Sequence, residues 1–286
     1  MDIKQERSSK TYFDGQWHDG NVKIAGPGTH AMWMASVVFD GARCMEGGAP
    51  DLDRHCARVV KSAELIGLAP KLSGPEIHAL ALEGIGLFPA ESELYIKPIY
   101  YAEEGFLVAD PESTCFTMVI TETPLPEPTG FSACRSSFRR PAMDMAITEA
   151  KASSLYPNVG RMLREANEKG FDTAVVLDPN SNVAEFAAAN LFMVKDGSVH
   201  TPVPNGTFLN GLTRQRVISL LGDDGTEVVE RTMSFAELSD ADELFSSANA
   251  SKVMPCIRLE DRDLQPGPVF RRARELYIEF ARASKI

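Results

Sequence analysis

A proline-rich stretch at 121–130, TETPLPEPTG, interrupts the chain. It holds three prolines and one glycine in ten residues. Proline fixes one backbone dihedral and removes a hydrogen-bond donor, so neither a helix nor a central strand runs through such a segment. Because 286 residues are many for one hydrophobic core, the break predicts two domains. We place the first domain at 1–123, a linker at 124–131 and the second domain at 132–286.

The first part of the chain alternates short β-rich segments with two helical patterns. An Asp-Gly dipeptide at 14–15 predicts a hairpin turn. Apolar residues at helical spacing, followed by Gly67, predict a helix that begins near Asp53. The elements expected here are a hairpin over 12–17, strands over 37–44, 94–101 and 115–121, and helices over 53–67 and 75–87.

The second part has the same irregular mixture of strands and helices, and no internal repeat. Gly170 and Gly211 mark the end of one helix and the start of another. The whole pattern predicts a mixed α/β (α+β) fold. The expected elements are strands over 131–140, 171–178, 227–233 and 242–249, two strands within 186–202, and helices over 159–169, after 211 and over 270–283.

Composition excludes several classes of protein. No apolar run approaches the roughly 20 residues that span a bilayer, and the polar N-terminus lacks a secretory apolar segment. A net charge of −11 opposes nucleic-acid binding. Five scattered cysteines without a C-x-x-C pair are typical of reduced thiols, so we expect a cytoplasmic protein without membrane or nucleic-acid partners. The five histidines show no metal-ligand spacing.

Four motifs follow one another in the second part: AKASSLYPN at 150–158, VAEFAAANLFMVKDG at 183–197, LNGLTR at 209–214 and the DELF…MP region from 242 to 255. Their order and spacing resemble those of the fold type IV, or class IV, aminotransferases, which use pyridoxal 5'-phosphate (PLP). Within that family the branched-chain amino-acid aminotransferases are most similar. Four motifs in family order are hard to produce by chance.

The resemblance implies one catalytic residue, Lys151, and two residues that contact the cofactor ring, Glu185 and Tyr156. Lys151 corresponds to the lysine that condenses with the PLP aldehyde as a Schiff base and later moves protons. Glu185 corresponds to the carboxylate that keeps the pyridine nitrogen protonated, so that the ring accepts electrons. Tyr156 corresponds to the tyrosine that reaches the phenolic oxygen of the cofactor.

The resemblance also implies a phosphate site. Arg58, in HCAR, corresponds to the arginine that binds the phosphate, and Arg54, one turn earlier, is the competing candidate. The backbone N–H groups of Leu212 and Thr213 start a helix, where anions bind readily. Asn249 stands where the family usually has threonine, and its amide can also donate.

The expected substrate pocket differs from the family pattern at several positions. Lys97 stands where the family usually has an arginine, and a lysine loses the bidentate fork. Met34 replaces a pocket tyrosine. Phe39, Tyr95 and Ala250 complete the set of pocket candidates. The basic run 135–140 is interpreted as a solvated or interface surface.

The fold that the resemblance implies has a small N-terminal α/β domain and a larger C-terminal, mixed-barrel-like domain. The implied activity is ping-pong transfer of an amino group between a branched-chain-like amino acid and a 2-oxo acid, in a homodimer. Alternatives are a lyase similar to aminodeoxychorismate lyase, an R-selective amine or D-amino-acid transaminase, and a non-catalytic PLP carrier.

Overall fold

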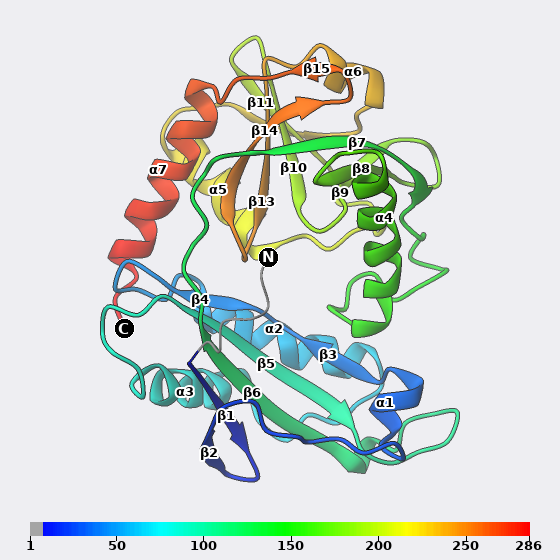
Figure 1. Ribbon diagram of the computed structural model, residues 1–286, viewed down its shortest axis with the longest axis vertical. Coiled ribbons are helices and arrows are strands. Elements are labelled where there is room, and N and C mark those ends of the chain that lie inside the picture. Colours follow the sequence, from blue (N-terminus) through cyan, green and yellow to red (C-terminus); the bar gives the residue numbers. More distant parts are fainter. Residues whose placement is uncertain (1–7) are drawn as a thin grey trace. The chain divides into compact units, whose positions relative to one another are not determined.

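The computed structural model describes residues 8–286 (Figure 1). Internal packing divides them into two units. Unit 1 contains 8–125, 150–154 and 280–286, and unit 2 contains 126–149 and 155–279. The chain first passes between the units at Leu125, within the expected linker. The expected first domain did not include 150–154 or 280–286, which also belong to unit 1. These two segments pair with the first part of unit 1 through antiparallel bridges, Ala152 with Val38 and Lys285 with Gly48.

Unit 1 contains a six-stranded sheet in the order β2-β1-β6-β5-β3, with β4 also pairing with β5, and every pair is antiparallel. The predicted hairpin is present, with Asp14 and Gly15 at φ 51° and 77° in its turn. The strands are β1 (Ser9–Phe13), β2 (Gln16–Asp19), β3 (Val37–Phe39), β4 (Ala42–Cys44), β5 (Leu94–Ala102) and β6 (Thr114–Glu122).

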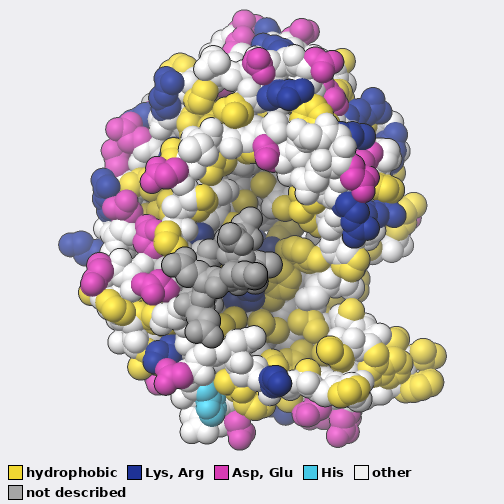
Figure 2. Space-filling view, viewed as in Figure 1, with side chains coloured by type: hydrophobic (Ala, Val, Ile, Leu, Met, Phe, Trp, Pro, Cys, Tyr) yellow, Lys and Arg dark blue, Asp and Glu magenta, His cyan; other side chains and the backbone are white. Residues whose placement is uncertain are grey.

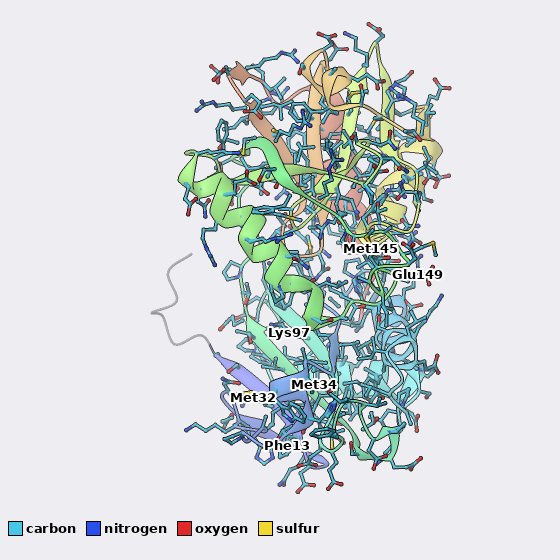
Figure 3. All side chains as sticks on the ribbon, turned by 90° about the vertical axis from the view of Figure 1, so that its right-hand side faces the viewer. Phe13, Met32, Met34, Lys97, Met145 and Glu149 are labelled. Atoms are coloured by element: carbon cyan, nitrogen blue, oxygen red, sulfur yellow. The ribbon has the colours of Figure 1, made fainter. Side chains whose placement is uncertain are left out.

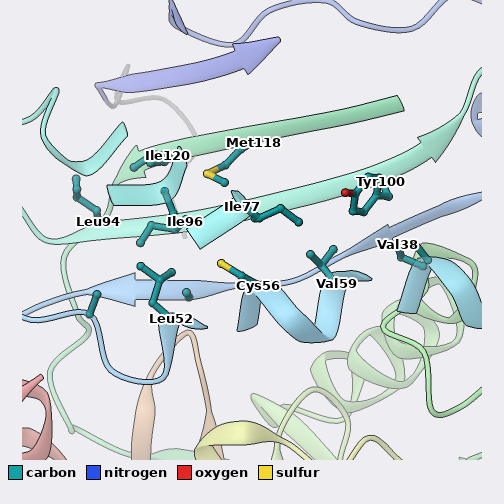
Figure 4. Packing of buried hydrophobic residues seen from close by; sticks show 14 of the residues in the cluster. Val38, Leu52, Cys56, Val59, Ile77, Leu94, Ile96, Tyr100, Met118 and Ile120 are labelled. Carbon is teal, nitrogen blue, oxygen red and sulfur yellow. The ribbon is translucent and has the colours of Figure 1, made fainter. Parts of the chain in front are cut away.

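Two helices cover the core of this sheet. The α2 helix (Leu52–Leu65) packs Cys56 and Val59 into one cluster with residues of β5 and β6 (Figure 4). The α3 helix (Gly74–Ile85) starts with a capping box between Ser73 and Glu76, which satisfies two backbone donors. The remaining elements are α1 (His30–Met34) and the 3₁₀ turn η1 (Pro111–Ser113).

Unit 2 contains a nine-stranded mixed sheet in the order β12-β11-β10-β13-β14-β7-β8-β9, with β15 paired to β14. Since β9 also packs against β10 and β11, the sheet curls toward a barrel. The strands are β7 (Phe131–Arg139), β8 (Thr173–Leu177), β9 (Val183–Phe186), β10 (Asn190–Lys195), β11 (Ser198–Pro202), β12 (Val228–Arg231), β13 (Glu243–Ala248), β14 (Lys252–Leu259) and β15 (Arg262–Asp263).

Three helices of unit 2, α4, α5 and α7, lie close to their predicted positions, and the short α6 was not predicted. Among them, α4 packs on β7 and β8, and α5 packs on β13. Pro157 suits the first turn of α4, where its missing N–H leaves no bond unmade. The elements are the turn η2 (Ser153–Leu155), α4 (Tyr156–Glu168), α5 (Leu212–Asp223), α6 (Phe235–Ser239) and α7 (Pro268–Ala283), whose last residues belong to unit 1.

The prediction of a mixed α/β fold is confirmed, although the short elements α1, α6, β9 and β15 were not predicted. Two further departures have a local cause. The segment expected as one strand over 37–44 is two short strands, β3 and β4, which pair with β5 in the same register. The ladder is interrupted between them, where the Gly41 N–H donates to the buried Asp40 side chain at 2.7 Å. Strand β14 was not predicted, since Pro255 lies within it and proline argues against a central strand.

Candidate functional site

In unit 1, Lys151 lies on a short extended segment beside β3. Its N–H donates to Ser62 Oγ at 3.2 Å, and its carbonyl accepts from the Phe39 N–H at 3.1 Å. The Nζ atom lies 5.0 Å from the centroid of the Phe39 ring. The structure therefore brings together the predicted catalytic lysine and one predicted pocket residue.

A buried ion cluster follows Phe39 directly. Asp40 is fully buried, and its carboxylate accepts from Arg58 Nε at 2.6 Å, from Arg58 Nη2 at 2.8 Å and from His55 Nδ1 at 2.7 Å. Burial alone would raise the pKa of Asp40, but the charges of Arg58 and His55 outweigh burial and lower it well below its ordinary value. Two donors of Arg58 are thus committed to Asp40.

We expect Asp40→Asn to destabilise unit 1 by about 3–5 kcal/mol, because it removes one partner of a buried ion pair. The same carboxylate makes stability depend on pH. Its folded pKa lies below its unfolded pKa of about 3.9, so its contribution is complete above pH ~4 and falls as the pH drops further. Urea unfolding at neutral pH measures the change, with Glu64→Gln on the exposed side of α2 as control. Equal stability of the two variants would contradict the expectation.

The predicted pocket residues of β5 lie on the face opposite the core. Leu94 and Ile96 are buried in the core, whereas Tyr95 and Lys97 alternate with them and are half-buried. Lys97 Nζ lies 5.8 Å from the centroid of the Tyr95 ring. Burial lowers the pKa of Lys97, which brings its titration closer to neutral pH.

Met34 is the last residue of α1 and is half-buried. Figure 3 labels it together with Lys97. A side chain at Gly41 would collide with the Tyr95 hydroxyl, so the backbone approaches this face closely. A larger residue at position 41 would require the Tyr95 side chain to move.

In unit 2, a buried hydrogen-bond chain runs from Glu185 on β9 to the start of α5. Asn190 Nδ2 donates to Glu185 Oε2 at 3.1 Å and to the Leu209 carbonyl at 3.0 Å, while Asn190 Oδ1 accepts from the Gly211 N–H at 3.2 Å. Glu185 and Asn190 are both 6 % exposed. A side chain at Gly211 would collide with Asn190 Oδ1. Asn190 thus connects two predicted site elements and was missed, although it lies inside the quoted motif.

The start of α5 is suited to an anion. Gly211 is its N-cap and no side chain caps the helix, so the first N–H groups keep their capacity to bind a ligand. Leu212 and Thr213 are buried there, at 7 % and 4 % exposure.

The remaining predicted residues of unit 2 lie at two other places. Asn249 and Ala250 form most of the tight turn between β13 and β14. Tyr156 begins α4 and is 38 % exposed. Asn190 stands directly opposite Ser247 on β13, two residues before Asn249. The hydrogen bonds that join Glu185, Asn190 and the start of α5 therefore lie near this turn.

Arg140 is an exception to the interpretation of the basic run as a solvated surface, whereas Arg135 and Arg139 are exposed as expected. Its Nη2 lies 2.9 Å from Glu185 Oε1 and donates to the Ala187 carbonyl at 2.6 Å. Its side chain is 10 % exposed and that of Glu185 is 8 % exposed. This buried positive charge favours the ionised form of Glu185. The pairing partners are 45 residues apart in sequence, so no local pattern marks them.

The family model of class IV aminotransferases (Amino-transferase class IV) matches residues 37–259. The chain therefore belongs to the class IV aminotransferases. Its curated relatives include the branched-chain-amino-acid aminotransferase of Pseudomonas aeruginosa, 28% identical over alignments covering 96% of this chain and 93% of the relative. The branched-chain-amino-acid aminotransferase of Escherichia coli is also 28% identical, over 95% of this chain and 93% of the relative.

Solved structures give the same picture. An aminotransferase from Brucella abortus bound to the cofactor PLP is similar with a TM-score of 0.95 and 50% identity, covering 96% of this chain and 99% of that one. The branched-chain amino acid aminotransferase of Escherichia coli has a TM-score of 0.88 at 26% identity, covering 98% and 96%. The predicted class of enzyme is confirmed.

Two negative findings apply to residues 8–286. No helix in this range is both long and apolar enough to cross a membrane. No group of three or more histidine, cysteine, aspartate and glutamate side chains in it is arranged to hold a metal ion.

Proposed function

We propose that this aminotransferase binds PLP and transfers amino groups between branched-chain-like amino acids and 2-oxo acids in a ping-pong reaction. The Brucella abortus structure, at 50% identity, is described as bound to PLP. The relatives from Pseudomonas aeruginosa and Escherichia coli are named branched-chain-amino-acid aminotransferases. These names support both the cofactor and the substrate class.

One observation carries the proposal: a single buried side chain, Asn190, holds both Glu185 and the uncapped start of α5. A cofactor with a ring nitrogen and a phosphate needs a carboxylate for the first and an anion site for the second. Both lie in unit 2 and are fixed to each other through that amide. The residues present therefore fit PLP.

When bound, PLP supplies an aldehyde that takes up the amino group and a ring that accepts electrons. Lys151 would bind the aldehyde carbon through Nζ and later move the proton at the substrate Cα. Glu185, held by Asn190 and Arg140, would keep the proton on the ring nitrogen. Arg58 and the backbone N–H groups of Leu212 and Thr213 would bind the phosphate, and Tyr156 would contact the phenolic oxygen.

The proposed substrate pocket combines apolar surface with one cation. Met34, Phe39 and Ala250 offer apolar contacts to a branched side chain, and Lys97 offers an ammonium to a substrate carboxylate. Tyr95, beneath Lys97, supplies a ring face that stabilises the cation. A lysine in this role gives weaker orientation than an arginine fork would.

We expect the PLP-loaded protein to convert L-leucine, L-isoleucine or L-valine with 2-oxoglutarate into glutamate. The donor alone should change the visible absorbance of the cofactor, and the acceptor should reverse that change, because the two half-reactions are separate. A stopped-flow absorbance trace and glutamate analysis together measure both. Protein that takes up no PLP would refute the proposal.

The same assay separates the alternatives. Release of pyruvate from aminodeoxychorismate without any acceptor would indicate a lyase. Faster reaction with D-leucine or an R-configured amine would indicate the opposite stereochemical preference. Binding of PLP without any donor-dependent absorbance change would indicate a carrier.

We further propose a homodimer in a reducing compartment such as the cytoplasm. Large apolar side chains are exposed on α1 and on the β5–β6 loop of unit 1: Met32, Trp33, Phe106, Leu107 and Val108. Figure 2 shows apolar side chains gathered at the end of unit 1 that carries these segments. Such a patch is typical of a protein interface. All five cysteines are free thiols, which suits a reducing environment. Analytical ultracentrifugation tests the dimer.

A further inference from the structure

Lys252, at the start of β14, combines two costly features. Its side chain is fully buried, and burying an ammonium is expensive unless it is well paired. Its backbone has φ 57°, in the left-handed region that glycine and asparagine favour. Strained residues of this kind concentrate at functional sites. A glycine would relieve both costs at this position, so the lysine side chain itself needs an explanation.

The geometry around its ammonium supplies one. Lys252 Nζ donates to Asn249 Oδ1 across the β13–β14 turn and lies 5.2 Å from the centroid of the Tyr277 ring on α7. A lysine ammonium is a donor only, so the carbonyl oxygen of Asn249 must face it. The Nδ2 donor of Asn249 therefore points away from Lys252. Without this contact the amide could present either its oxygen or its nitrogen to a ligand.

The turn borders the start of α5. Ser247, two residues before Asn249, stands opposite Asn190, and Asn190 accepts from the N–H of Gly211. The Ser247 hydroxyl is buried and has no hydrogen-bond partner within the described part of the chain, so it can donate to a group bound at this place. Uncapped N–H groups, this hydroxyl and the β13–β14 turn thus belong to one region of unit 2.

We propose that Lys252 is a positioning residue for the cofactor phosphate. It holds the Asn249 amide so that Nδ2 donates to a phosphate oxygen, and it adds a buried positive charge beside that anion. The inference rests on the proposed binding of PLP and concerns how this chain uses asparagine at position 249. An asparagine needs such an anchor because its amide has both a donor and an acceptor end.

The first test replaces Asn249 by aspartate. The carboxylate has nearly the shape of the amide and pairs with Lys252, so the fold is retained, but it only accepts hydrogen bonds and repels a phosphate. We expect the Kd of the PLP-free protein for PLP to rise by about tenfold or more, with little change in the Kd for pyridoxal, which lacks the phosphate. Absorbance titration measures both constants, and thermal unfolding checks the fold.

The second test is Lys252→Met, with Lys195→Met as matched control. Lys195 lies at the far end of β10, and its side chain is 41% exposed. Only Lys252→Met should lower the preference for PLP over pyridoxal, by about tenfold. Suppose that the wild type binds PLP but the variants keep the wild-type preference for PLP, or lose affinity for PLP and pyridoxal equally. This result would overturn the inference about Lys252 and leave the proposed function standing. Wild-type protein that binds no PLP would overturn the proposed function as well.

Discussion

We expect Lys151→Ala to lower the transamination rate by at least about 1,000-fold, because the substitution removes the proposed proton carrier at the substrate Cα. The fold should survive. The bonds that fix this segment to unit 1 are made by the backbone of Lys151, to Ser62 and to Phe39, and alanine keeps them.

The measurement is glutamate formation from L-leucine and 2-oxoglutarate, with circular dichroism as a check on folding. Lys61→Ala on the exposed side of α2 removes an amine elsewhere in the same unit and should leave the rate unchanged. Borohydride reduction of the loaded protein should attach the cofactor to wild type and not to Lys151→Ala. A near wild-type rate in the variant would show that a group other than Lys151 transfers the proton at the substrate Cα.

Glu185→Gln should lower kcat by about 100-fold with a smaller effect on PLP binding. Removing one preorganised electrostatic group typically costs 10²–10³ in kcat. Glutamine can still accept from Asn190 through its oxygen, but its amide nitrogen would then face Arg140 Nη2, donor against donor. The carboxylate charge and the ion pair are lost together, whereas the phosphate site is unchanged.

Steady-state kinetics and PLP titration measure the two effects separately, and Glu168→Gln on the exposed face of α4 is the control. Full activity of Glu185→Gln would remove Glu185 from the mechanism. If the variant instead lost cofactor and activity in proportion, Glu185 would serve in binding alone.

Periodicity and turn residues predicted most of the local structure. The hairpin at Asp14-Gly15 and the helices α2 and α3 follow from signals within a few neighbouring residues, and each lies where it was expected. The β14 strand escaped because Pro255 contradicts the local signal for a central strand. Its pairing with β13 and β7 overrides that signal.

The candidate site was predictable where motifs carry it, and not where long-range pairing builds it. Lys151 and Glu185 lie in recognisable motifs. The contacts that hold Glu185 and Arg58 in place, from Arg140 and Asp40, join residues 45 and 18 positions apart. Such pairs depend on how strands are brought together. A basic run next to a strand end has the same sequence whether its arginines are exposed to solvent or paired with a buried carboxylate. The pairing of Arg140 with Glu185 could therefore not be predicted from the sequence.

Unit 1 is built from three separate stretches of chain, so it cannot be completed during biosynthesis until the last stretch has been made. Its last stretch, 280–286, pairs Lys285 with Gly48, so about 240 residues must leave the ribosome between the two halves of that bridge. Contacts this distant form late and slow folding. In the nascent chain the backbone groups of 48–49 therefore wait for 284–285, and chaperone demand during translation should fall on unit 1 rather than on unit 2.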